Sequence, residues 1–141
     1  MFDELHKYKN KGHFFFKKGQ LFSQESKNVP NKHGVYYIFR LAQHNVDMVY
    51  IGKSETIEQN GEYINQSLRE MFDNKRQNVK RQVFFEQKMI EEDIEALDIY
   101  WFVTFDEKHQ DLPEYAKGLI MQSYFETFGE LPPWNEEYQE T

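Results

Sequence analysis

Two short apolar segments separated by a brief polar stretch constrain the fold of this chain more than any other feature. Residues 34–41, GVYYIFRL, alternate between two sets of side chains, as a strand with two different faces does. Residues 48–53, MVYIGK, predict a second strand, and residues 42–47 between them read as a loop. Because so short a connection cannot carry a crossover, the two strands are expected to form an antiparallel hairpin.

The spacing of the two strands suggests how they pair. A register that places Leu41 opposite Asp47 also places Tyr36 opposite Gly52. Tyr36 and Tyr50 then share one face of the hairpin as diagonal neighbours. Since Gly52 has no side chain, it leaves open space for the ring of Tyr36.

The rest of the chain predicts helices and one further strand around this hairpin. Residues 13–18 suit a short strand or an extended lead-in, and turn residues follow at 28–34. Asp111 is a candidate N-cap and Gly129 a candidate stop for the last long helix. The expected elements are helices at about 63–74, 79–96 and 111–129, a strand at 98–105 and an extended exit at 131–135.

This order predicts an α+β fold, with a small three-stranded antiparallel sheet flanked by helices. The 141 residues suit one domain, in which residues 1–29 form an N-terminal extension packed on a domain formed by residues 30–141. The chain has no cysteine, no apolar run near the roughly 20 residues of a membrane span and no apolar signal-peptide core at its start. We therefore expect a cytoplasmic protein with no membrane contact.

The net charge of −7 weighs against nucleic-acid binding, because such binders usually present a basic face. Basic residues nevertheless gather in one stretch, and Lys53 ends the second strand. A run of charges is usually a solvent-exposed face, and the alternative is a surface that binds phosphate groups. The candidates for binding phosphate are Lys53, Lys75, Arg76, Lys80 and Arg81.

Three short motifs resemble those of a known family. GVY at 34–36 and YIG at 50–52 are similar to the two signature tripeptides of the GIY-YIG nucleases, and PPWN at 132–135 is similar to the end of that domain. The resemblance covers residues 30–136. It implies a GIY-YIG-like fold and metal-dependent hydrolysis of a DNA phosphodiester bond, with Mg²⁺ or Mn²⁺ as cofactor and DNA as partner.

The resemblance also implies roles for particular residues. Tyr36 and Tyr50 match the tyrosines near the attacking water, and Asn135 matches the asparagine that supports the site. In the family, an arginine on the first helix holds the scissile phosphate and a glutamate on a later helix binds the metal. Together these two groups neutralise the charge that develops on the phosphate.

Those last two positions depart from the family pattern. Ser67 stands where the arginine is expected, and Gln122 stands where the glutamate is expected. Arg69 lies two residues after Ser67, about 200° further around a helix, so it can hold the scissile phosphate in place of the family arginine only if the helix shifts. Glu114 is the candidate for a displaced metal ligand, or else it stabilises the start of its helix. Both departures favour a site that has lost catalysis.

The last long helix carries one unexpected cation. Lys117 falls within the apolar arc of that helix. Its ammonium group either extends to solvent or takes the place of the metal ion that the family binds. On a helical wheel that arc consists of Ile120, Met121, Tyr124, Phe125 and Phe128.

Three functions therefore remain open. The chain is an active or weakly active endonuclease that uses Arg69 and a displaced acid, a non-catalytic module that binds nucleic acid or a protein partner, or a structural or regulatory protein that does not touch nucleic acid.

Overall fold

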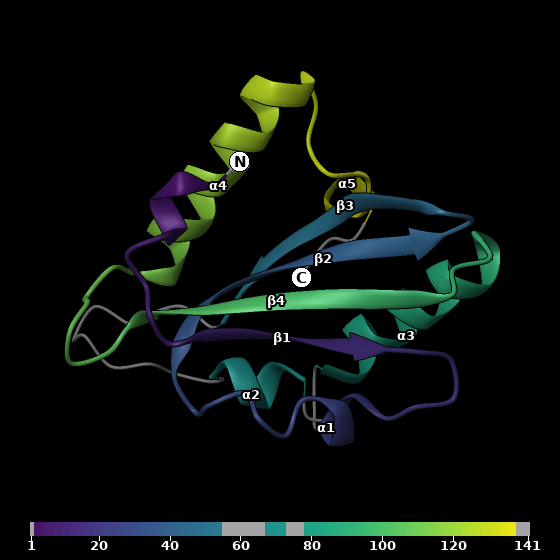
Figure 1. Cartoon of the computed structure of the whole chain (residues 1–141), viewed down its shortest axis with the longest axis horizontal. Helices are drawn as coiled ribbons and strands as arrows, with labels where there is room; N and C mark the ends of the chain where they lie inside the picture. The colour runs from purple at the N-terminus through teal and green to yellow at the C-terminus, as the bar shows by residue number, and fades with distance from the viewer. Residues whose placement is uncertain (1, 55–66, 73–77, 138–141) are drawn as a thin grey trace.

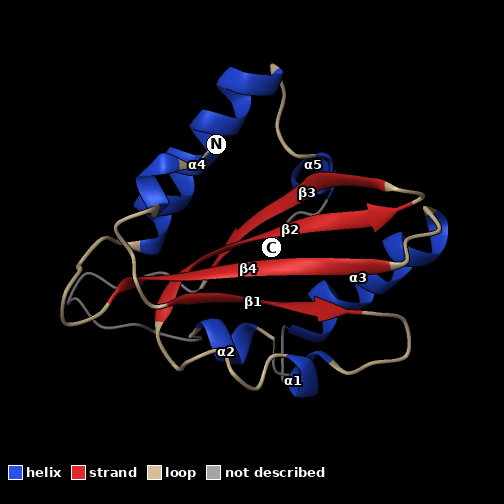
Figure 2. Cartoon of the chain, in the orientation of Figure 1, coloured by secondary structure: helices blue, strands red, loops and turns tan. Residues whose placement is uncertain are grey.

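The computed structural model describes residues 2–54, 67–72 and 78–137, and for residues 78–81 it describes the backbone alone. A single antiparallel sheet of four strands, in the order β1-β4-β2-β3, runs through this part of the chain (Figure 2). Helices accompany it, so the α+β class is confirmed, but the prediction of three strands is wrong. The strands are β1 (Lys11–Phe16), β2 (His33–Ala42), β3 (Asn45–Lys53) and β4 (Ala96–Phe105).

The additional strand is β1, which comes from the expected N-terminal extension. It pairs with β4 along its whole length, with Lys11 opposite Phe102 and Phe16 opposite Leu97. Phe16 is fully buried, whereas Phe15 is 47% exposed. The three consecutive phenylalanines hide this alternation in the sequence, and the pairing partner lies about 85 residues further along the chain. For these reasons only the structure shows that the segment belongs to the sheet.

The hairpin is tighter than the sequence predicts. Gln43 and His44 adopt positive φ angles of 49° and 69°, the combination found in two-residue type I′ turns. The strands therefore run up to this turn, and the predicted loop at 42–47 shrinks to Gln43 and His44.

The predicted register of the hairpin is right at one end and wrong at the other. Tyr36 lies opposite Gly52, as expected. A register shift between Ile38 and Phe39 then moves the pairing by one residue, so that Leu41 faces Val46 instead of Asp47. Because the shift lies between Tyr36 and the turn, it does not disturb the pairing at Gly52.

The helices differ from their predicted ranges mainly at their ends. The described helix after β3 spans only four residues, and its predicted start at 63–66 lies outside the described residues. The expected extended exit at 131–135 contains a short helix, which begins at Pro133, a residue suited to a first helical position. The helices are the 3₁₀ turn η1 (Asp3–Leu5), α1 (Phe22–Glu25), α2 (Leu68–Met71), α3 (Asn78–Glu91), α4 (Pro113–Phe128) and α5 (Pro133–Glu137).

The two ends of α4 show why its boundaries fall where they do. Pro113 occupies the first turn, and Gly129 ends the helix with a φ of 75°, as predicted for a glycine stop. Asp111 is not the cap. Its carboxylate instead accepts a hydrogen bond of 2.5 Å from the Tyr8 hydroxyl and pairs with Lys7 at 2.7 Å. These contacts fasten the N-terminal segment beside α4 (Figure 1).

The two faces of the sheet carry two separate cores. We call the face that bears Tyr36 and Tyr50 the tyrosine face, and the opposite one the α4 face. Residues of α1, α2, α3 and α5 pack on the tyrosine face, whereas α4 and the N-terminal segment pack on the α4 face, where the core includes Val35, Ile51, Phe102, Ala116, Ile120 and Tyr124. Among the described helices, none is both long enough and apolar enough to cross a bilayer.

Candidate functional site

The two signature tyrosines lie side by side on the tyrosine face, as the sequence predicts. Their ring centroids are 6.0 Å apart, and Tyr36 is fully buried while Tyr50 is 3% exposed. The Tyr36 ring lies across Gly52, where a Cβ atom would stand 2.3 Å from its Cζ atom. Phe72 and Phe85 pack against the two rings at 5.0 and 5.3 Å. Both tyrosines are therefore members of an aromatic core.

Asn135 is placed beside β3 by the short helix α5. Its side-chain amide donates to the Ile51 carbonyl and its side-chain oxygen accepts from the Ile51 N–H, both at 2.8 Å. The neighbouring Trp134 is fully buried and anchors α5 in the core. Asn135 thus uses both ends of its amide group to hold the C-terminal segment against the hairpin.

Ser67 does not lie inside a helix, which corrects the predicted placement. It is the N-cap of α2, where its hydroxyl accepts from the Glu70 N–H at 3.3 Å and its own N–H donates to the Glu70 carboxylate at 3.1 Å. This reciprocal pair is a capping box, and its S-x-x-E pattern is present in the sequence. The Ser67 hydroxyl also bonds to Asn31 at 3.2 Å. Arg69, in the first turn of α2, is exposed.

Gln122 lies on α4, the helix that packs on the face opposite the two tyrosines. Its side chain is exposed and donates to Glu126 one turn later at 2.8 Å. The predicted apolar arc of this helix is also wrong in part, because Phe125 and Phe128 are 49% and 52% exposed. The buried residues of α4 are Pro113, Ala116, Ile120 and Tyr124, and Lys117 is half-buried at the border of that set.

The candidate metal ligand and one candidate phosphate ligand contact each other. The Lys53 ammonium lies 3.9 Å from the Glu114 carboxylate, so this pair links the end of β3 to the start of α4. Of the other basic candidates, Lys75 and Arg76 lie outside the described residues, and Lys80 and Arg81 belong to α3 with undescribed side chains.

The described residues do not provide a set of ligands that suits Mg²⁺. No group of three His, Cys, Asp or Glu side chains capable of holding a metal ion occurs among them. Gln122 is neutral and exposed, and Glu114 faces a lysine. A divalent site needs several oxygen ligands converging on one point. Glu114 and Gln122 do not meet this requirement.

A half-buried histidine lies at the start of β2. His33 Nδ1 is 3.3 Å from the Ser54 hydroxyl, which also accepts from the Gly34 N–H at 3.0 Å. Burial lowers the pKa of His33 from 6.5 to about 4, although the Glu70 carboxylate acts in the opposite direction. The imidazole is consequently neutral near pH 7, and Ser54, which is fully buried, bridges the ends of β2 and β3.

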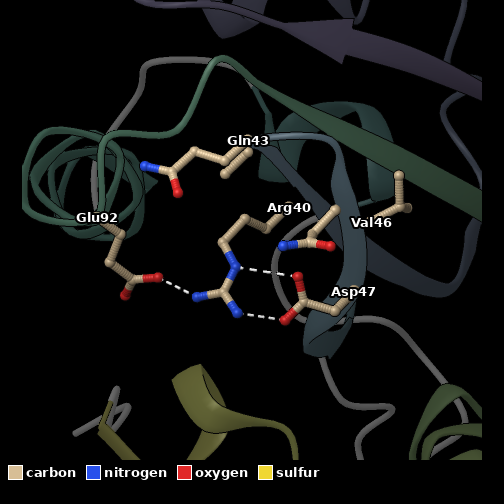
Figure 3. A pocket seen from close by; sticks show the side chains of 7 residues that line it. Arg40, Gln43, Val46, Asp47 and Glu92 are labelled. Carbon is tan, nitrogen blue, oxygen red and sulfur yellow. Dashed lines mark hydrogen bonds and ion pairs between the residues drawn. The ribbon is translucent and has the colours of Figure 1, made fainter.

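An arginine that the sequence analysis did not single out organises the turn end of the hairpin. Arg40 bonds to the carboxylates of Asp47 and Glu92 beside a cavity of about 420 Å³ (Figure 3). Burial alone would raise the pKa of Glu92, but hydrogen bonds from Arg40, Lys88 and Trp134 hold it below its ordinary value. An arginine at the end of an apolar alternation was the sequence signal for this network.

Comparisons with known proteins identify no relative. No protein-family model, no curated protein and no solved structure matches the chain. Its functional interpretation therefore depends on its own residues and on the contacts described above.

Proposed function

We propose that this chain is a GIY-YIG-like domain that does not hydrolyse phosphodiester bonds and serves as a nucleic-acid-binding module. The two tripeptides, their pairing in one hairpin and the terminal asparagine support the family relationship. The loss of hydrolysis is supported by the hydrogen bonds within the fold that Ser67, Gln122 and Asn135 make.

The placement of Gln122 is the observation that carries the proposal. A metal ligand for a reaction at the tyrosines must reach the tyrosine face, but Gln122 lies exposed on α4, which packs on the opposite face. Ser67 is committed to a capping box and Asn135 to the backbone of Ile51. Restoring an arginine and a glutamate at positions 67 and 122 would therefore not rebuild the site.

Nicking of supercoiled plasmid tests the absence of hydrolysis. The purified protein is incubated with Mg²⁺ or Mn²⁺ beside the Tyr36→Phe variant and the double variant Ser67→Arg/Gln122→Glu. We expect no nicking by any of the three proteins. Nicking by the wild type that is lost in Tyr36→Phe would refute the proposal and show that the buried tyrosine takes part in cleavage.

Fluorescence anisotropy with labelled single-stranded, double-stranded and branched DNA tests binding. We expect an affinity that falls as the salt concentration rises, because phosphate contacts release bound counterions. Absence of binding to all three substrates at low salt would reject the nucleic-acid part of the proposal.

A protein partner is the second candidate, because α4 carries large exposed apolar side chains. Leu112, Tyr115 and Leu119, at its start, are 41%, 57% and 37% exposed, and Phe125 and Phe128 follow near its end. Scattered exposed apolar residues are normal, but Leu112, Tyr115 and Leu119 share one side of the helix by their spacing, and a contiguous apolar patch is typical of an interaction surface. Tyr115→Ser and Leu119→Ser would weaken partner capture and leave DNA binding unchanged if this surface binds protein.

A further inference from the structure

The α4 face of the sheet has an aromatic region that α4 does not cover. His13 on β1, Tyr100 on β4 and Tyr37 on β2 lie opposite one another, and they form one row across three strands. The ring centroids of His13 and Tyr100 are 4.8 Å apart and those of Tyr37 and Tyr100 are 5.3 Å apart, with interplanar angles of 10° and 20°. Tyr37 and Tyr100 are half-buried and His13 is exposed, so this row reaches solvent.

A buried carboxylate fixes the orientation of the outermost ring in this row. His13 Nδ1 lies 2.8 Å from the carboxylate of Asp98, whose side chain is only 11% exposed. This contact engages one ring nitrogen and leaves Nε2 for a ligand. The ring is thus held by stacking on Tyr100 and by Asp98 before any ligand arrives.

A pocket of about 450 Å³ adjoins the row, between it and the N-terminal segment. Such a volume lies within the range of small-molecule sites. Its described lining is aromatic, aliphatic and basic, with no carboxylate, and consists of Phe2, Leu5, His6, Lys11, Gly12, His13, Tyr37, Tyr100 and Phe102. Lys11 is exposed and has no ion-pair partner among the described residues.

We propose that this pocket binds a nucleobase that carries a phosphate group, either as a free mononucleotide or as the end of a single strand. Aromatic side chains bind bases of any sequence through their π faces, and the Lys11 ammonium group supplies donors for the phosphate. A cationic ligand is disfavoured because the described lining is basic and Asp98 is already engaged by His13. The pocket lies on the face opposite Tyr36 and Tyr50, so it is separate from the family site.

The decisive experiment is a titration followed by NMR of the aromatic and histidine side chains. The probes are adenosine monophosphate, adenosine, and a 5′-phosphorylated eight-residue deoxyadenosine oligonucleotide, each added to the full chain. We expect the phosphorylated probes to shift the resonances of His13, Tyr37 and Tyr100, and adenosine to bind more weakly. Binding of the oligonucleotide but not of the mononucleotide would identify a strand as the source of the base, and the reverse would identify a free nucleotide.

Lys11→Gln and Lys18→Gln form a matched pair of variants, since both remove one exposed lysine charge. Lys11 lines the pocket and Lys18 does not. We expect Lys11→Gln to weaken binding of the phosphorylated probe about fivefold, the scale of a partly exposed charge contact, and Lys18→Gln to leave it nearly unchanged. His13→Ala should weaken binding as well, because it removes the outermost ring.

Failure of this inference is distinguishable from failure of the proposed function. If DNA binds but neither the pocket resonances nor the affinity of Lys11→Gln changes, the pocket assignment is wrong and DNA binding stands. If no phosphorylated probe shifts the His13, Tyr37 or Tyr100 resonances at millimolar concentration, the pocket does not bind this class of ligand.

Discussion

Replacing Gly52 with alanine tests the central packing contact of the hairpin. The added Cβ atom would stand 2.3 Å from Cζ of Tyr36 and 2.5 Å from its hydroxyl oxygen, whereas ordinary contact begins at 3.4 Å. The fully buried ring would have to move by about 1 Å against Phe72 and Tyr50. Such overpacking costs about 1–3 kcal/mol, and the stiffer unfolded chain returns about 0.4–1 kcal/mol of that loss. The free energy of unfolding should therefore fall by about 1–2 kcal/mol.

Urea unfolding followed by the fluorescence of Trp101 and Trp134 measures this change, and the melting temperature should fall by roughly 2–8 °C. Gly118→Ala is the matched control, because nothing lies within 4 Å of its added Cβ atom. It sits inside α4, so alanine should stabilise the protein by up to about 1 kcal/mol. If Gly52→Ala is neutral, or stabilises the protein as Gly118→Ala does, the Tyr36 ring does not lie over Gly52 and the argument fails.

Three further predictions concern polar contacts. Asn135→Ala removes two hydrogen bonds to β3 and should lower the free energy of unfolding by about 1–3 kcal/mol in the same urea assay, and an unchanged midpoint would contradict that role. Arg40→Met removes a hydrogen-bond donor that keeps the pKa of Glu92 low, and this low pKa stabilises the fold above pH 4.5 but not at lower pH. Because the variant loses part of that stabilisation, its acid unfolding, followed by circular dichroism, should begin at a higher pH than that of the wild type. His33 is neutral in the fold down to about pH 4 but takes up a proton near pH 6.5 when unfolded, so stability should decline on acidification across that interval; His33→Gln should flatten the decline, and an unaltered slope would exclude His33 as its source.

The hairpin could be predicted because the residues that define it lie close together in the sequence. Alternating side chains define both strands, and the absence of a side chain at Gly52 matches the bulk of Tyr36 opposite it. The error at Leu41 arose because a register shift leaves no sign in the alternation of β2 itself. The type I′ turn was hidden for a similar reason, since Gln43 and His44 are not the Asn-Gly pair that usually marks it.

The parts that could not be predicted depend on distant partners. Large apolar residues lie on several sides of α4, so a helical wheel cannot show which of them contact the sheet. The residues that meet it are set by the packing of α4 against β2 and β3, which buries Ala116 and leaves Phe125 half exposed. Ser67 is different, because its S-x-x-E pattern with Glu70 is a local signal that predicts an N-cap.

The hydrogen bonds of Asn135 also determine what β3 can do as one of the two edge strands of the described sheet. A strand from another molecule that added itself alongside β3 would need the N–H and carbonyl of Ile51, and the Asn135 amide already engages both. The side chain thus acts as a one-residue substitute for a fifth strand and blocks edge-to-edge association at this point. A chain shortened before residue 132 would expose this part of the edge and would also lose the buried Trp134, so the C-terminal segment both completes the core and guards the edge of the sheet.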